Sequence, residues 1–121
     1  MTPPELLELT ARLLAGPPPS MRSCWQRGCV VLTRAALEDT LAGYWNRTEP
    51  TLAGSPMRHQ LLALPFYADE EVAVRARIAW SGLCRAAHHH SYELAPTTAE
   101  LHGWLRDVTA VLRLLSDGKD R

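Results

Sequence analysis

The residues most capable of chemistry lie close together in the second half of this 121-residue chain. Arg85 is followed by three consecutive histidines, His88, His89 and His90, and then by Tyr92. An arginine guanidinium can hold a phosphate through paired hydrogen bonds, and a histidine exchanges its proton near neutral pH. Cleavage of a phosphodiester needs a phosphate-binding cation and a proton-transfer group at one place. The segment therefore favours phosphodiester chemistry, with Arg85 and one histidine as candidate catalytic residues.

Helix geometry and spacing favour different histidines as the partner of Arg85. On an ideal helix Arg85 and His89 are one turn apart and share a face, whereas His90 points about 140° away from Arg85. His90 can meet Arg85 only if the helix loosens near its end, or if the two residues meet across a dimer axis. Three histidines at a helix C-terminus can also be a solvated end that interacts well with the helix dipole. A zinc site is a further alternative, although adjacent histidines point in different directions.

Composition and charge are typical of one globular domain without a strong bias toward nucleic acid. The formal net charge is +0, so any nucleic-acid binding must come from a local patch of charge. No apolar run approaches the ~18 residues of a membrane span, and the N-terminus lacks the pattern of a signal peptide, so we expect a cytoplasmic protein. The three cysteines form no C-x-x-C pair and are expected to be free core thiols. The arginines that could extend a phosphate-binding patch are Arg22, Arg27, Arg34, Arg75 and Arg77.

The spacing of apolar residues predicts helices and no strand. Five helices are expected, over about 3–15, 20–46, 57–64, 70–88 and 98–115, with loops at 47–56 and 91–96. Both Thr2–Glu5 and Thr97–Glu100 have the form of a capping box. Short connections favour antiparallel neighbours, so the expected fold class is all-α, an up-and-down bundle of four to five helices. A single domain should span 1–121, with an N-terminal helix and Pro-rich linker at 1–19 and a frayed tail at 116–121.

The string from Arg85 to Tyr92 resembles the R-x4-H-x-Y motif of the HEPN superfamily, small helical domains that are often metal-independent ribonucleases. The segment Thr33–Glu38 is similar to the family's R-A-L-E helix. The motif is also expected in the next-to-last helix, before one closing amphipathic helix. The likeness therefore extends over most of the chain and implies a HEPN-like bundle.

The resemblance implies a homodimer, formed through the motif helices, that cuts single-stranded RNA or tRNA in a shared cleft. Arg85 would hold the scissile phosphate and His90 would act as general base or acid, with His89 as a competitor and no metal or other cofactor. The resemblance also implies a toxin or defence component with a nucleotidyltransferase antitoxin, which would modify Tyr92 with AMP. Tyr92 could instead be a half-buried ring that packs the loop against the last helix.

Two alternatives to catalysis follow from residues of the same helix. Many active family members carry Asn or Asp directly after the arginine, where this chain has Ala86. Ala86 therefore favours a degenerate HEPN module that binds RNA, a nucleotide or a partner protein without cutting. The small residues Ala79, Gly82, Ala86 and Ala87 would let another helix approach closely. A purely structural bundle could dimerise there, and Gly82→Leu would then break the dimer.

Overall fold

The computed structural model describes residues 1–88 and 94–116, and within these ranges it contains helices and no strand. The predicted all-α fold class is therefore confirmed. The predicted frayed tail lies outside the described residues, apart from Ser116, which ends the last helix. The long helices are α1 (Pro3–Ala15), α2 (Trp25–Thr48), α5 (Glu70–Ala87) and α6 (Thr98–Ser116), and the short ones are α3 (Pro50–Ala53) and α4 (Met57–Ala63), with 3-10 turns at Pro19–Met21 and Leu64–Phe66.

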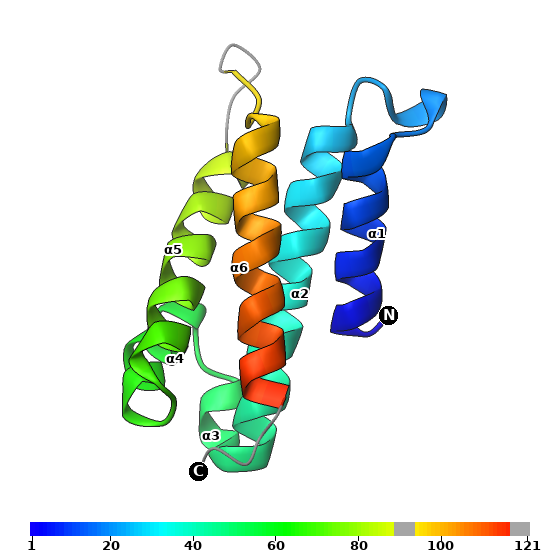
Figure 1. Cartoon of the computed structure of the whole chain (residues 1–121). Coiled ribbons are helices and arrows are strands. Elements are labelled where there is room, and N and C mark those ends of the chain that lie inside the picture. Colours follow the sequence, from blue (N-terminus) through cyan, green and yellow to red (C-terminus); the bar gives the residue numbers. More distant parts are fainter. Residues whose placement is uncertain (89–93, 117–121) are drawn as a thin grey trace.

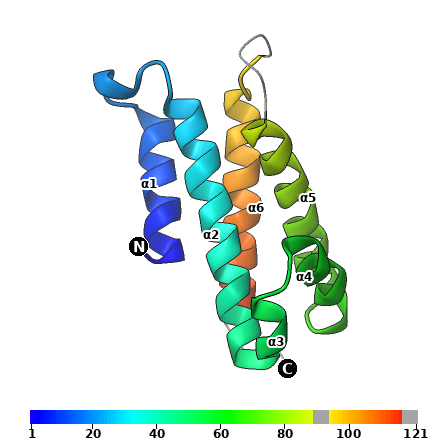
Figure 2. The same cartoon turned by 180° about the vertical axis from the view of Figure 1, so that it is seen from behind.

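The four long helices run alternately up and down, with α2 and α6 in the middle (Figures 1 and 2). α2 and α6 pack against each other, and each also packs against both α1 and α5. The last turns of α1 and α5 therefore meet the first turns of α2 and α6 at one end of the bundle. This end, formed by residues 11–31, 81–88 and 94–103, is named the motif end, and the opposite end, formed by residues 47–71, is named the base. None of the described helices is both long enough and apolar enough to cross a membrane.

Reciprocal side-chain caps set the start of α1 and of α6. Thr2 Oγ1 accepts a hydrogen bond from the Glu5 amide at 3.4 Å, and Glu5 Oε1 accepts one from the Thr2 amide at 2.8 Å. Thr97 and Glu100 repeat this arrangement at 3.1 and 2.9 Å. Hydrogen bonds from the Thr2 backbone and side chain hold the pKa of the Glu5 carboxyl below its usual value. Both capping boxes expected from the sequence are confirmed.

The second helix differs from its prediction at both ends. It begins at Trp25, later than expected, because a 3-10 turn at Pro19–Met21 comes first. It continues to Thr48, and Pro50 then opens α3 inside the segment 47–56 that was predicted as a loop. Proline suits the first position of a helix, where its missing N–H has no helical partner. The residue that suggested a loop therefore starts a short helix.

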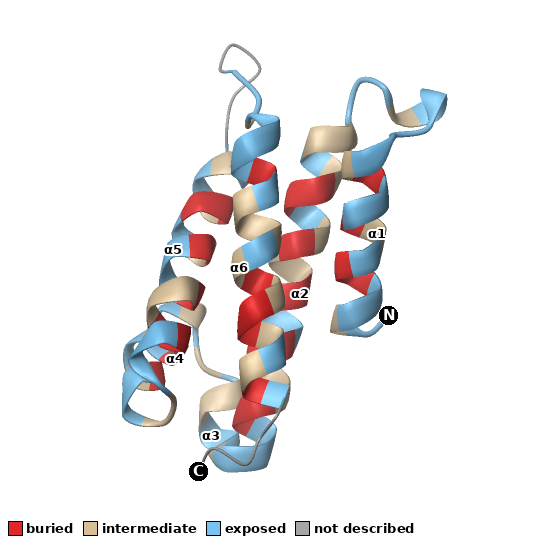
Figure 3. Ribbon diagram, viewed as in Figure 1, coloured by how far each residue is buried: buried red, intermediate tan, exposed pale blue. Residues whose placement is uncertain are grey.

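The core lies along the sides that the long helices turn toward one another (Figure 3). Trp45 is fully buried, with the rings of Tyr44 and Tyr67 edge-on to it at 5.2 and 5.1 Å. The Tyr44 hydroxyl donates to the Tyr67 carbonyl at 3.1 Å and so ties α2 to the chain that follows α4. Such edge-on aromatic pairs add stabilisation beyond the burial of their surface. This cluster therefore holds the base of the bundle together.

Gly82 of α5 faces α6 of the same chain. Ala79 and Gly82 are buried, and a Cβ added to Gly82 would clash with the Trp104 indole, at 2.7 Å from Cε2 and 2.9 Å from Cζ2. The glycine therefore lets the backbone of α5 contact the ring directly. The small residues do let another helix approach, as expected, but that helix is α6. The expectation that Gly82→Leu breaks a dimer is corrected, because its surroundings lie within one molecule.

The three cysteines are free, but they do not share one environment. Cys29 is fully buried and Cys84 is partly buried, and burial raises the pKa of both thiols. Cys24 is exposed just before α2, so the prediction that it is a core thiol is wrong. The apolar spacing of α2 includes Cys29, whereas Cys24 precedes the first turn of that helix and falls outside its buried face.

The close contact at Gly82 predicts that substitution of glycine by alanine has opposite effects on stability at Gly82 and at Gly103. Gly103→Ala should raise the free energy of unfolding by about 0.5–1 kcal/mol, because the nearest atom to its new Cβ is Arg106 Nη2 at 4.0 Å. Gly82→Ala should lower it by about 1–2 kcal/mol, because overpacking against Trp104 outweighs the helix-propensity gain. Urea denaturation followed by circular dichroism measures both, and effects of the same sign would contradict this packing.

The cysteine environments predict an order of alkylation. Iodoacetamide at neutral pH should label Cys24 first, Cys84 more slowly and Cys29 only after denaturation, because burial restricts access and raises the pKa of the last two thiols. Peptide mapping by mass spectrometry over a time course gives the three rates. Labelling of Cys29 in the native protein as fast as Cys24 would contradict the assigned position of α2.

Candidate functional site

Arg85 is placed at the motif end by the last turn of α5, and its side chain is exposed. One terminal nitrogen, Nη1, donates to Ser81 Oγ at 3.1 Å, one turn earlier. Within residues 1–88 and 94–116, no carboxylate forms an ion pair with this guanidinium. A guanidinium has five N–H donors, so most of them stay available to an anion arriving from solvent.

The α-helical conformation of α5 ends at Ala87, before the predicted catalytic histidines. His88 occupies the C-cap position with φ −106° and ψ 14°, and its Nδ1 lies 2.8 Å from the Cys84 carbonyl oxygen. Since a carbonyl oxygen only accepts, Nδ1 is the donor in this contact. The pairing of Arg85 with His89 on one helical face assumes a helix that continues past Ala87, where α5 ends. His89 and His90 lie outside the described residues, as does Tyr92.

Two hollows flank Ala86 at the motif end. The first, named the α5–α6 hollow, has a volume of about 400 Å³ and is lined by Arg85 and Trp104 among others. The second, named the α2–α5 hollow, has a volume of about 380 Å³ and includes Arg27. Ala86 and the segment 95–96 line both hollows and so separate them. Each hollow therefore carries one exposed arginine.

Charge is divided unevenly between the two ends of this neutral chain. The described segments of the motif end contain four arginines and a single carboxylate, Glu100, which is held in the capping box with Thr97. The base contains four carboxylates and two arginines. The motif end therefore carries the local positive patch that a neutral chain needs to attract phosphate. Its arginines are Arg22, Arg27, Arg85 and Arg12, the last of which pairs with Glu8 at 3.4 Å.

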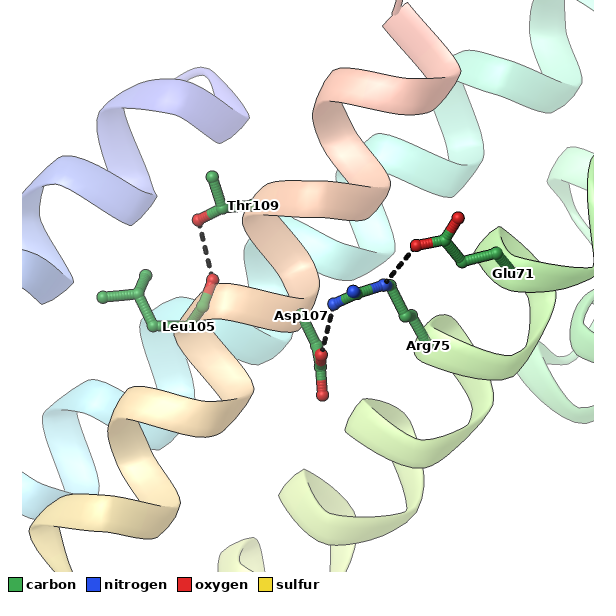
Figure 4. Close-up of polar contacts among 5 residues, drawn as sticks. All are labelled: Glu71, Arg75, Leu105, Asp107 and Thr109. Carbon is green, nitrogen blue, oxygen red and sulfur yellow. Dashed lines mark hydrogen bonds and ion pairs between the residues drawn. The ribbon is translucent and has the colours of Figure 1, made fainter.

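Two arginines that were candidates for this patch are bound elsewhere. The Arg34 guanidinium lies 4.8 Å from the centre of the Trp80 ring, a cation–π contact that links α2 to α5. Arg75 donates to Asp107 Oδ1 at 2.9 Å and to Glu71 Oε2 at 3.2 Å (Figure 4). Both side chains therefore serve packing between helices. The candidates that do lie at the motif end are Arg22 and Arg27, whereas Arg77 is exposed on α5 outside that end.

Trp104 is the site residue that sequence reasoning missed. It lies in α6, is only partly buried, and lines the α5–α6 hollow. The available signal was Gly82, since a glycine inside a helix marks a close approach by a large neighbour. No group of three or more His, Cys, Asp or Glu side chains that could hold a metal ion occurs in the described part of the chain.

Comparison of the chain with protein-family models, with curated proteins and with solved structures finds no match. Functional inference therefore depends on the chemistry of the motif end itself.

The exposure of Arg85 predicts that its removal spares the fold. Arg85→Ala should change the free energy of unfolding by less than about 0.5 kcal/mol, as expected for a surface substitution. Arg75→Ala should lower it by up to about 1 kcal/mol, because the pair with Asp107 is lost. Urea denaturation of the two variants beside the wild type tests this order. A larger loss for Arg85→Ala would contradict an exposed, solvent-facing guanidinium.

Proposed function

We propose that the protein is a metal-independent endoribonuclease of HEPN type that cuts single-stranded RNA or tRNA at the motif end. The observation that carries the proposal is the R-x4-H-x-Y string that begins at Arg85. Two structural features support it: Arg85 is exposed without a described carboxylate partner, and the surrounding end of the bundle has an excess of arginine. A cytoplasmic toxin or defence role, with a nucleotidyltransferase partner that modifies Tyr92, belongs to the same proposal.

The proposed roles follow from the chemistry of the two side chains. Arg85 holds the scissile phosphate with paired donors and offsets the negative charge that builds up on it during cleavage. His90, or His89 in its place, accepts the proton of the ribose 2′-hydroxyl or donates one to the leaving oxygen. Because the 2′-hydroxyl is an internal nucleophile, the step needs no metal-activated water.

A dimer that joins two motif segments would use the outward side of α5. Gly82 is covered by Trp104 and Ala79 is buried, so these two small residues are not available to a partner. Ile78 and Ser81 are exposed on the same helix as Arg85, and Ile78 retains 54% of its surface. We therefore assign the proposed interface to the surface around Ile78 and Ser81.

A non-catalytic HEPN module is the second candidate, and Ala86 favours it. Ala86 is partly buried against the core and lines both hollows. Its methyl group supplies no hydrogen bond beside Arg85, where a polar residue would help to orient the catalytic pair. In this case the motif end would bind RNA, a nucleotide or a partner protein without cleaving it.

The first test is cleavage of a tRNA pool by the purified chain in EDTA. The wild type should cleave, and His90→Ala should reduce the rate by roughly 10²–10⁴-fold, the usual contribution of general acid–base catalysis. Arg85→Ala should also abolish detectable cleavage. The matched control is Arg77→Ala, which removes an exposed arginine from the same helix and should leave the rate unchanged. Denaturing gels with labelled RNA give the rates.

The pattern of losses separates the candidates. Cleavage that survives Arg85→Ala would overturn the nuclease proposal for this site. Loss of cleavage in His89→Ala, with His90→Ala active, would transfer the proton-transfer role to His89. Binding of RNA without any product, weakened by Arg85→Ala and by salt, would support the non-catalytic module, since phosphate contacts release counterions. Mass measurement of the protein must first establish that Tyr92 carries no AMP.

A further inference from the structure

Two large apolar side chains project from the base of the bundle. Leu62, near the end of α4, is 68% exposed, and Phe66, in the following 3-10 turn, is 86% exposed. They are four residues apart in one short segment, on either side of the junction between α4 and the 3-10 turn. Leu62 and Phe66 together are named the apolar knob. Removing such side chains from water is favourable, so a partner that covers the knob gains stability from the contact.

An apolar groove lies on the other side of the molecule, between α1 and α2. It has a volume of about 460 Å³, and Leu9, Leu13 and Met21 are among its lining residues. Gly28 also lines it, with the Met21 methyl 3.1 Å from where a Cβ would be. Val31, which is 57% exposed, lines the groove as well. These residues define the α1–α2 groove, which offers an apolar surface large enough for side chains from a partner.

Charges around the knob and the groove are opposite in sign. Residues 8–28, which supply most of the groove, contain three arginines and one carboxylate, Glu8, which pairs with Arg12 at 3.4 Å, and Arg27 lines the groove itself. Residues 57–75, which carry the knob and the start of α5, contain three carboxylates and two arginines, and one of these carboxylates, Glu71, pairs with Arg75 at 3.2 Å. Complementary charges of this kind steer two surfaces together and set their relative orientation.

The knob and the groove lie at opposite ends of the same molecule. The knob belongs to α4 and the turn after it, at the base, whereas the groove lies at the motif end of α1 and α2 (Figure 2). A knob therefore cannot enter the groove of its own chain. It can enter the groove of another copy. The apolar surfaces and the opposite charges of the knob and the groove favour a second copy of the chain as the partner.

We propose that the chain associates head to tail, with Leu62 and Phe66 of one copy seated in the α1–α2 groove of the next. The contact is heterologous, because each copy contributes a different surface, so every pair leaves one knob and one groove free. Assembly then continues into a ring or an open chain. The surfaces are separate from the outward side of α5, so this association does not depend on the proposed nuclease dimer.

Complementary variants test the head-to-tail contact. Phe66→Asp removes the knob and Val31→Asp blocks the groove, and both positions are exposed enough to leave the fold intact. By sedimentation, the wild type should gain mass with concentration, and each variant alone should lose this gain. An equimolar mixture should regain mass, because the intact knob of Val31→Asp fits the intact groove of Phe66→Asp. Leu94→Asp, another exposed apolar residue outside both surfaces, should behave as the wild type.

The result on mixing decides the proposal. A mixture no heavier than its two components overturns it, as does a wild type whose mass is independent of concentration. Self-association retained by Phe66→Asp but lost by Val31→Asp would show a groove-to-groove contact instead. Leu62→Asp supplies a second knob variant, and circular dichroism of each variant verifies folding before the comparison. Association that strengthens with salt would contradict the charge complementarity, since screening weakens attraction between opposite charges.

Discussion

The contact between Gly82 and the Trp104 indole is the constraint on which the motif end depends. It brings the backbone of α5 against α6, where any larger side chain at position 82 would push the helices apart. Arg85 follows one turn later, so the same contact determines where its guanidinium stands relative to the first turn of α6. The ring that fills this contact also lines the α5–α6 hollow. Packing and the candidate site therefore share one side chain.

The alternating helix directions explain how a neutral chain acquires a charged end. Arginines that are far apart in sequence, such as Arg27 and Arg85, reach the same end because α2 begins where α5 finishes. The carboxylates of the base, by contrast, come from one continuous segment, residues 47–71. This division of charge supports both proposals, since it offers phosphate a positive end and gives successive copies complementary ends.

Local sequence signals were sufficient for most of the helical architecture. Capping boxes at Thr2 and Thr97 mark helix starts through bonds between neighbours in the chain, and such bonds need no tertiary partner. The misassigned segments have weaker local signals. Proline at position 50 fits both a loop and the first turn of a helix, and packing against α2 favours the helix. Likewise, an unpaired cysteine is usually buried, but Cys24 comes just before the first turn of α2 and is exposed.

The sequence by itself determined the helices, their order and the residues that could bind phosphate and move protons, because periodicity, capping and side-chain chemistry are local properties. Only the tertiary structure decided which arginines are available. Arg34 is stacked on Trp80 and Arg75 is paired with Asp107, whereas Arg85 remains exposed. It also decided that Gly82 packs against α6 of its own chain. Which residues distant in sequence come into contact depends on how the helices pack, and no local pattern specifies that packing.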